Sequence, residues 1–98
     1  MKNTIRVLSL LEEIMPTFLE NRRKDVGALQ LAIQQSDFAL VRTIGHKMKG
    51  SSASYGFEDL SQIGLIIENA GISKDSASAT LGLQKLSSFL ENLEVVYI

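Results

Sequence analysis

The sequence predicts an all-α protein, an up-down antiparallel four-helix bundle with an additional short N-terminal helix. Three observations predict this fold class. Apolar residues recur at intervals of three and four along nearly the whole chain, which is the spacing of amphipathic helices. The chain has one proline and neither an Asn-Gly nor an Asp-Gly pair, so the usual signals of β-hairpins are missing. The connections between the helical segments are short, and short connections favour antiparallel neighbours.

Two helices are predicted in the N-terminal third. Asn3 or Thr4 can cap a short helix over about residues 4–14. Pro16 is typical of the first turn of a new helix, so a longer helix is expected over about residues 16–35. The series that keeps the helical steps is Ile5, Leu8, Leu11, Met15, Phe18, Arg22, Val26, Leu29 and Ile33.

Three further segments complete the bundle. Asp37 is a good N-cap for a helix that Gly56 is expected to end as a left-handed C-cap. The next helix is expected over about residues 58–70, terminated by Gly71. A polar connection over residues 72–78 leads to a last helix that is expected to run to about residue 96.

Composition limits the functions that are possible. Ninety-eight residues are enough for one domain, residues 1–98, with a single modest core. The absence of cysteine excludes disulfides and thiolate chemistry, and a single histidine excludes a His-Glu-x-x-His zinc site. A net charge of −1 gives no basic face for nucleic acid, so no nucleic-acid partner is expected.

No membrane association is expected either. No stretch approaches the roughly 18 uninterrupted apolar residues of a membrane span. The apolar segment after the N-terminus is broken by Ser9, Glu12 and Glu13, which argues against a secretory signal. We therefore expect a cytoplasmic monomer, and Met1 favours a free-standing protein over a domain excised from a larger kinase.

The only histidine, His46, is predicted to face solvent. The inward line of its helix runs through Phe38, Val41, Gly45, Met48, Ser52 and Tyr55. Measured from Met48, His46 lies about 160° away on the helical wheel. Its own stripe consists of Ala39, Arg42, Thr43, Lys49, Gly50 and Ala53, which contain two cations, four small residues and no carboxylate.

Several roles are open to such a histidine. A lone surface histidine usually has no function. A metal ligand would need further ligands, and the flanking Arg42 and Lys49 repel cations. A catalytic base would need an orienting carboxylate, and the stripe offers none. A nucleophile that receives a phosphoryl group fits best, because Lys49 at i+3 can reach the phosphoryl oxygens and Arg42 at i−4 can support it.

Gly50 is the more diagnostic neighbour. A glycine inside a helix costs about 1 kcal/mol relative to alanine. On the exposed face, one turn beyond His46, such a residue leaves room for a phosphoryl group or a docking partner, although it can also have no function. Gly45 lies on the inward line, where close helix packing explains it.

At these residues the chain resembles the histidine phosphotransfer (HPt) domain family. The family pattern is a histidine, two residues, lysine, glycine and small residues, with a glycine that ends the helix. His46, Lys49, Gly50, Ser51, Ser52 and Gly56 stand in the matching positions. The flanking segments agree over residues 15–71, including Leu60 through Ile67-Glu68 in the following helix.

The resemblance implies a phosphorelay carrier. His46 would accept a phosphoryl group from the aspartate of a receiver domain and pass it to another receiver, with Lys49 offsetting charge and Gly50 giving access. The domain would have no ATP site and no cofactor, and magnesium would belong to the partner receiver. The expected partners are response-regulator receiver domains and a hybrid sensor kinase.

Two points stay open at this stage. Docking is expected on Ala39, Thr43, Ala53 and Ser54, with a rim at Tyr55, Gly56 and Phe57, although Tyr55 is also a good core residue. The alternative function is an HPt-like docking module that regulates a sensor kinase or receiver without relaying phosphate. A plain helical dimerisation bundle is a third interpretation, but the long coiled coil and the ATP domain that it needs are missing.

Overall fold

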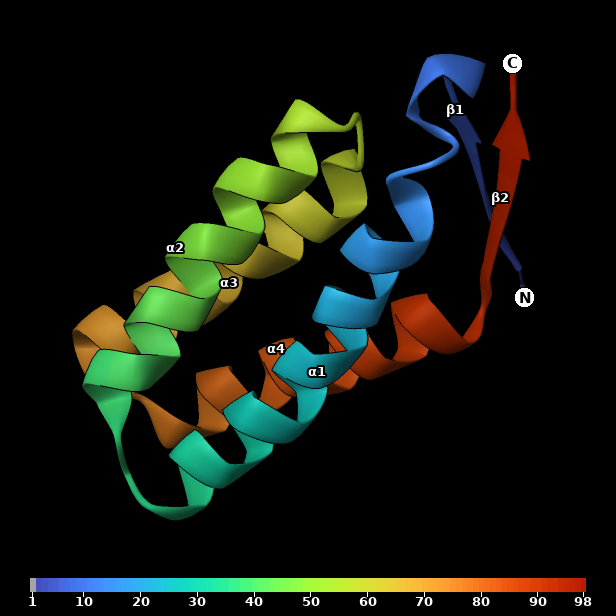
Figure 1. Cartoon of the computed structure of the whole chain (residues 1–98). Helices are drawn as coiled ribbons and strands as arrows, with labels where there is room; N and C mark the ends of the chain where they lie inside the picture. The colour runs from blue at the N-terminus through green and yellow to red at the C-terminus, as the bar shows by residue number, and fades with distance from the viewer. Residues whose placement is uncertain (1) are drawn as a thin grey trace.

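The computed structural model describes residues 2–98. Four α-helices make up most of the chain, and a short strand lies at each end of it (Figure 1). The helices are α1 (Met15–Gln34), α2 (Phe38–Ser54), α3 (Glu58–Ser73) and α4 (Ser76–Glu91). The remaining elements are β1 (Asn3–Val7), the single-turn 3-10 helix η1 (Ser9–Leu11) and β2 (Leu93–Tyr97). The predicted all-α bundle of four helices is therefore confirmed in its main part.

Helix α2 begins where the sequence predicts it. The side chain of Asp37 accepts a hydrogen bond from the Leu40 amide at 3.1 Å, as an N-cap does. After the helix ends, Gly56 adopts a left-handed backbone with φ of +81°, which a residue without a Cβ adopts without strain. The cap and the glycine thus fix the length of the helix that carries His46.

Helices α2 and α3 lie against each other along a seam of glycines. A Cβ built on Gly64 would lie 2.6 Å from the Lys49 nitrogen, and one built on Gly71 would lie 2.6 Å from the Arg42 Cα. A Cβ on Gly45 would likewise collide with the backbone of Glu68. Because all three positions lack a side chain, the two backbones approach closely, and side chains beside the seam can reach from one helix to the other.

Helix α1 packs on the other side of α2, and a hydrogen bond between two side chains links these helices. Arg22 pairs with Asp25 at 2.9 Å and donates a hydrogen bond to Ser51 Oγ at 2.5 Å. The Arg22 guanidinium also lies 5.1 Å from the centre of the Phe18 ring, a cation–π distance. The core between the helices is apolar, with Met15, Leu29, Val41, Met48, Phe57, Leu60, Ile67 and Leu86 fully buried.

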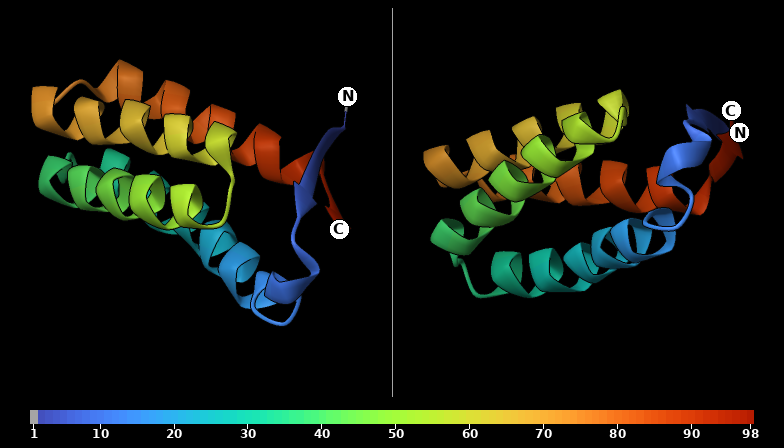
Figure 2. Two further views of the ribbon diagram at one scale, coloured as in Figure 1. Left: turned by 90° about the horizontal axis from the view of Figure 1, so that it is seen from above. Right: turned by 45° about the horizontal axis from the view of Figure 1, so that its top comes forward.

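The predicted N-terminal helix over residues 4–14 is wrong. Residues 3–7 form β1, which pairs in parallel with β2 in the register Asn3–Leu93 to Val7–Tyr97. The strands and both chain ends lie together at one end of the bundle (Figures 1 and 2). Ser9 extends the contact, since its amide and its hydroxyl both donate to the Ile98 carbonyl. The segment is extended because its apolar side chains are covered by β2 and the core together.

Two helix ends also differ from the prediction. Gly71 does not terminate α3, because it lies in the seam against Arg42, and the helix ends at Ser73 with Lys74 in the left-handed conformation. The last helix ends at Glu91 and not near residue 96, because residues 93–97 form β2. In both cases a contact with another element decides the local structure.

Candidate functional site

His46 lies in the middle of α2, and its side chain is 70% exposed. The predicted solvent-facing orientation is therefore confirmed. Its Nδ1 atom lies 2.7 Å from Oε2 of Glu68, which comes from α3. The imidazole is thus accessible to a partner and is also held in place from one side.

Glu68 is the residue that organises this site. Its side chain is only 12% exposed, and its second oxygen, Oε1, accepts a hydrogen bond from Nζ of Lys49 at 2.7 Å. Each carboxylate oxygen therefore has one partner from α2. We name His46, Glu68 and Lys49 the site triad. The expectation that no carboxylate lies beside His46 is wrong, since the missing carboxylate comes from the neighbouring helix.

The charge state of Glu68 fixes the tautomer of His46. The hydrogen bond from Lys49, and next the one from His46, hold the pKa of Glu68 below its usual range, although burial acts in the opposite direction. The group is therefore an ionised carboxylate at neutral pH, and an ionised carboxylate can only accept hydrogen bonds. In the neutral imidazole, Nδ1 must then carry the proton and Nε2 keeps its lone pair.

The α2–α3 seam positions the triad. Glu68 lies one turn after Gly64 and one turn before Gly71, so all three residues share the stripe of α3 that faces α2. Gly45, one residue before His46, packs against the Glu68 backbone itself. With a bulkier residue in this seam, the carboxylate would lie farther from the imidazole.

The other predicted site residues lie on the expected face of α2. Gly50 is exposed, and nothing lies within 4 Å of a Cβ built on it. Ala39, Thr43, Ala53 and Ser54 are also exposed. Their role in docking stays a prediction.

The predicted rim at the end of α2 is corrected at one position. Phe57 is fully buried, with its ring 5.2 Å from that of Phe18, and so it belongs to the core. Tyr55 is half-buried and packs edge-on against Phe18 at 5.0 Å. The aromatic residues here stabilise the contact between α1 and α2.

Two apolar residues of α3 were missed by the sequence prediction. Leu65 is 36% exposed and Ile72 is 56% exposed. They lie one turn before and one turn after Glu68, on the same side of the helix. Neither residue falls on the inward line of α3. Two large apolar residues outside that line were the signal in the sequence that could have revealed this surface. They add apolar surface beside the triad, which the small residues of α2 do not supply.

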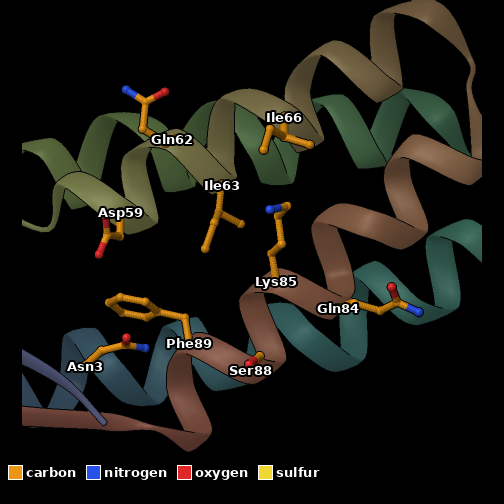
Figure 3. Close-up of a pocket in the computed structure, with 9 residues that line it drawn as sticks. All are labelled: Asn3, Asp59, Gln62, Ile63, Ile66, Gln84, Lys85, Ser88 and Phe89. Atoms are coloured by element: carbon orange, nitrogen blue, oxygen red, sulfur yellow. The ribbon is translucent and has the colours of Figure 1, made fainter. Parts of the chain in front are cut away.

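A second groove lies away from the site triad. A hollow of about 470 Å³ runs between α3 and α4, with Ile63, Ile66 and Phe89 along its floor (Figure 3). Polar side chains stand around it, including Asp59 and Lys85. It contains neither a histidine nor a paired carboxylate, so it offers none of the chemistry that the site triad offers.

The fold and the site together define a helical bundle that presents one anchored histidine on an exposed helix face. A comparison with protein-family models gives a match to the Hpt domain over residues 13–79. The match spans well over half of the chain and includes the whole site triad. The chain belongs to the Hpt domain family, whose members carry phosphoryl groups on histidine in phosphorelays, dock with receiver domains and have no ATP site of their own.

Other comparisons add no relative, since no curated protein and no solved structure matches this chain. Within residues 2–98, no helix is both long and apolar enough to span a membrane. The same residues contain no group of three or more His, Asp or Glu side chains that could hold a metal ion.

Proposed function

We propose that His46 accepts a phosphoryl group from the aspartate of one receiver domain and transfers it to the aspartate of another. The observation that carries this proposal is the hydrogen bond between Nδ1 of His46 and the Glu68 carboxylate. In the neutral imidazole this bond puts the proton on Nδ1 and leaves the lone pair of Nε2 available, on a side chain that is 70% exposed. A nucleophile needs an available lone pair and an open approach, and Nε2 has both.

The bonds and charges of the transfer balance without an added proton donor. The lone pair of Nε2 attacks phosphorus, the bond between phosphorus and the aspartyl oxygen breaks, and the aspartate leaves as a carboxylate. The ring becomes positively charged while Nδ1 keeps its proton. The negative charge of Glu68, 2.7 Å from Nδ1, stabilises that imidazolium. In the onward transfer the second aspartate attacks phosphorus and His46 returns to its neutral form.

Lys49 and Gly50 support this step in different ways. Lys49 neutralises Glu68 in the triad, and its positive charge, on the same helix face as His46, offsets part of the charge of an arriving phosphoryl group. Gly50 leaves open space one turn beyond His46, where a partner's loop can approach the backbone. Neither residue forms a covalent bond in the reaction.

The rest of the chemistry is assigned to the partner. Magnesium is expected on the receiver domain, because Glu68 is already bonded to a lysine and a histidine, which is unlike the oxygen-rich sites that magnesium prefers. Transfer then depends on positioning and charge neutralisation by both proteins. A hybrid sensor kinase carrying a receiver domain is the expected source of the phosphoryl group, and the protein is expected to act as a monomer.

A relay assay tests the proposal. A receiver domain loaded with labelled phosphate is mixed with this protein, and acid-labile label on the protein is followed before and after a second receiver is added. We expect label on the wild type and none on His46→Gln, with helix content retained. Binding of the receiver without transfer of label would instead indicate a regulatory docking module, and label that survives His46→Gln would overturn the site.

A further inference from the structure

A groove beside His46 opens toward the N-terminal half of α2. It has a volume of about 390 Å³ and is lined by Ala39, Arg42, Thr43, His46, Lys47 and Glu68. Side chains in an α-helix lean toward the N-terminus of the helix. The imidazole of His46 therefore lies over the turn that contains Arg42 and Thr43, and a phosphoryl group on Nε2 would enter this groove.

The charges around the groove are not equally available. Lys49 is paired with Glu68 at 2.7 Å, so the triad has no net charge while the imidazole is neutral. Lys47 also lines the groove and forms no ion pair within residues 2–98, and its charge helps to lower the pKa of Asp25 on α1, which burial raises. Arg42 is exposed and forms no ion pair within residues 2–98. Arg42 lies one turn before His46 on the same stripe of α2, whereas Lys47 is the next residue along the helix, about 100° around it.

The backbone of Arg42 is also firmly placed. It packs against Gly71 in the seam, where a Cβ on the glycine would lie 2.6 Å from the Arg42 Cα. The side chain thus starts from a fixed point one turn before His46. A guanidinium can bind two phosphoryl oxygens at once, which an ammonium cannot do in the same planar geometry.

We propose that Arg42 binds the phosphoryl oxygens in this groove, while Lys49 serves mainly to neutralise Glu68. This proposal rests on the proposed function of His46, and it assigns different roles to the two cationic residues beside it, Arg42 and Lys49. Ala39, one turn before Arg42 on the same face, keeps the groove wide enough for the phosphoryl group.

The test uses phosphoramidate, a small donor that needs no docking. Its phosphorus–nitrogen bond breaks as the bond to Nε2 forms, and ammonia leaves. We expect Arg42→Gln to slow the labelling of His46 about fivefold to tenfold, less than the loss seen for buried donors because the groove is open to solvent. Arg42→Lys should recover part of the rate. Titration with inorganic phosphate, followed by NMR of the His46 ring, should show weaker binding in Arg42→Gln by about threefold or more.

Arg23→Gln is the matched control. Arg23 is exposed on α1 and does not line the groove. Its replacement by glutamine changes the net charge by the same amount as Arg42→Gln does. Arg23→Gln should label and bind phosphate like the wild type. If Arg42→Gln matches Arg23→Gln in both measurements while the wild type is labelled, the assignment of Arg42 is wrong. If the wild type takes no label from phosphoramidate or from a receiver, the function of His46 itself is wrong.

Discussion

The carboxylate of Glu68 receives one hydrogen bond on each oxygen, from Nδ1 of His46 and from Nζ of Lys49. Because both donors come from α2, a single side chain of α3 aligns the nucleophile and balances the nearest charge. This makes Glu68 a positioning residue that acts through the imidazole and does not itself touch the phosphoryl group.

Two substitutions of Glu68 separate its alignment of the His46 ring from its negative charge. We expect Glu68→Ala to release the ring and to slow transfer from a receiver about 10-fold to 100-fold, since small misplacements of reacting groups are costly. Glu68→Gln keeps an acceptor oxygen for Nδ1 and should therefore slow the transfer less than Glu68→Ala does. Nitrogen-15 NMR of His46 reports the tautomer directly. We expect protonated Nδ1 in the wild type and in Glu68→Gln, and a mixture in Glu68→Ala. Equal rates in all three proteins would contradict a positioning role.

Glu68 also predicts a pH dependence of stability. Its pKa in the folded protein lies below the usual value near 4.5, chiefly because of Lys49 and then His46. Unfolding restores the usual pKa, so the stabilisation is fully present above about pH 5 and is lost as the pH falls through the lowered folded pKa. The difference in unfolding free energy between wild type and Glu68→Gln should shrink as the pH falls below about 4.5. Urea unfolding at several pH values below about 5 measures this difference, and a difference that grows as the pH falls through that range would contradict the stabilising role of the Glu68 charge.

The sequence predicts His46 and its orientation, but it does not predict the Glu68 carboxylate beside it. The orientation of His46 follows from its angle to Met48 on one helix, and the structure agrees. Glu68 could not be placed in the same way, because it lies 22 residues later and its approach depends on how two helices pack. A signal existed in the spacing of Gly64, Glu68 and Gly71, which puts a carboxylate between two glycines on one helix stripe.

At the scale of the helix, glycines serve two different purposes. Gly45, Gly64 and Gly71 lie in the seam, where an added Cβ would collide with the backbone of the facing helix. Gly27 and Gly50 lie on exposed faces of α1 and α2, with nothing within 4 Å of an added Cβ. The first group permits the packing of α2 against α3, whereas the second weakens its own helix.

Alanine at Gly50 should therefore raise stability and impair function. The substitution improves helix propensity by about 1 kcal/mol, and thermal unfolding should show a higher melting temperature. Transfer from a receiver should nevertheless slow, because the methyl group occupies the space beside His46. Gly27→Ala is the control: it should give a similar gain in stability with unchanged transfer. If Gly50→Ala transfers as fast as Gly27→Ala, Gly50 has no role in access.

The same contrast explains why one helix end was predicted correctly and another was not. Gly56 follows α2 and needs a left-handed backbone, which is a local property. Gly71 has the same sequence context of a glycine near the end of an apolar stretch, but its role depends on Arg42 of another helix. Local patterns do not separate a terminating glycine from a packing glycine.

At the scale of the whole molecule, the parallel pairing of β1 with β2 joins the two ends of the described chain. It was not predicted, because residues 5, 8 and 11 fit helical spacing and a strand partner some 90 residues away leaves no local trace. The β-branched and aromatic residues Val95, Val96 and Tyr97 were the available signal. The strand pair lies at one end of the bundle (Figure 1), whereas His46 lies in the middle of α2 by its position between Phe38 and Ser54.

The strand pair should stabilise the bundle without affecting the chemistry. Val7 is 2% exposed, so Val7→Ala should cost about 2 kcal/mol through lost burial and the cavity it leaves. Thr4→Ala, at an exposed position on the same strand, should cost far less. Urea unfolding gives the free energies, and transfer rates under folding conditions should equal the wild-type rate for both variants. A slower transfer in folded Val7→Ala would show that the strands influence the site.

The proposed transfer depends most on a single atom, Nε2 of His46. Its most direct test is to phosphorylate the protein from a receiver domain and to locate the phosphoryl group, by peptide mass spectrometry for the residue and phosphorus-31 NMR for the ring nitrogen. We predict one phosphoryl group, on Nε2 of His46, with Nδ1 still protonated and bound to Glu68. A phosphoryl group on Nδ1, or on any other residue, would contradict the account.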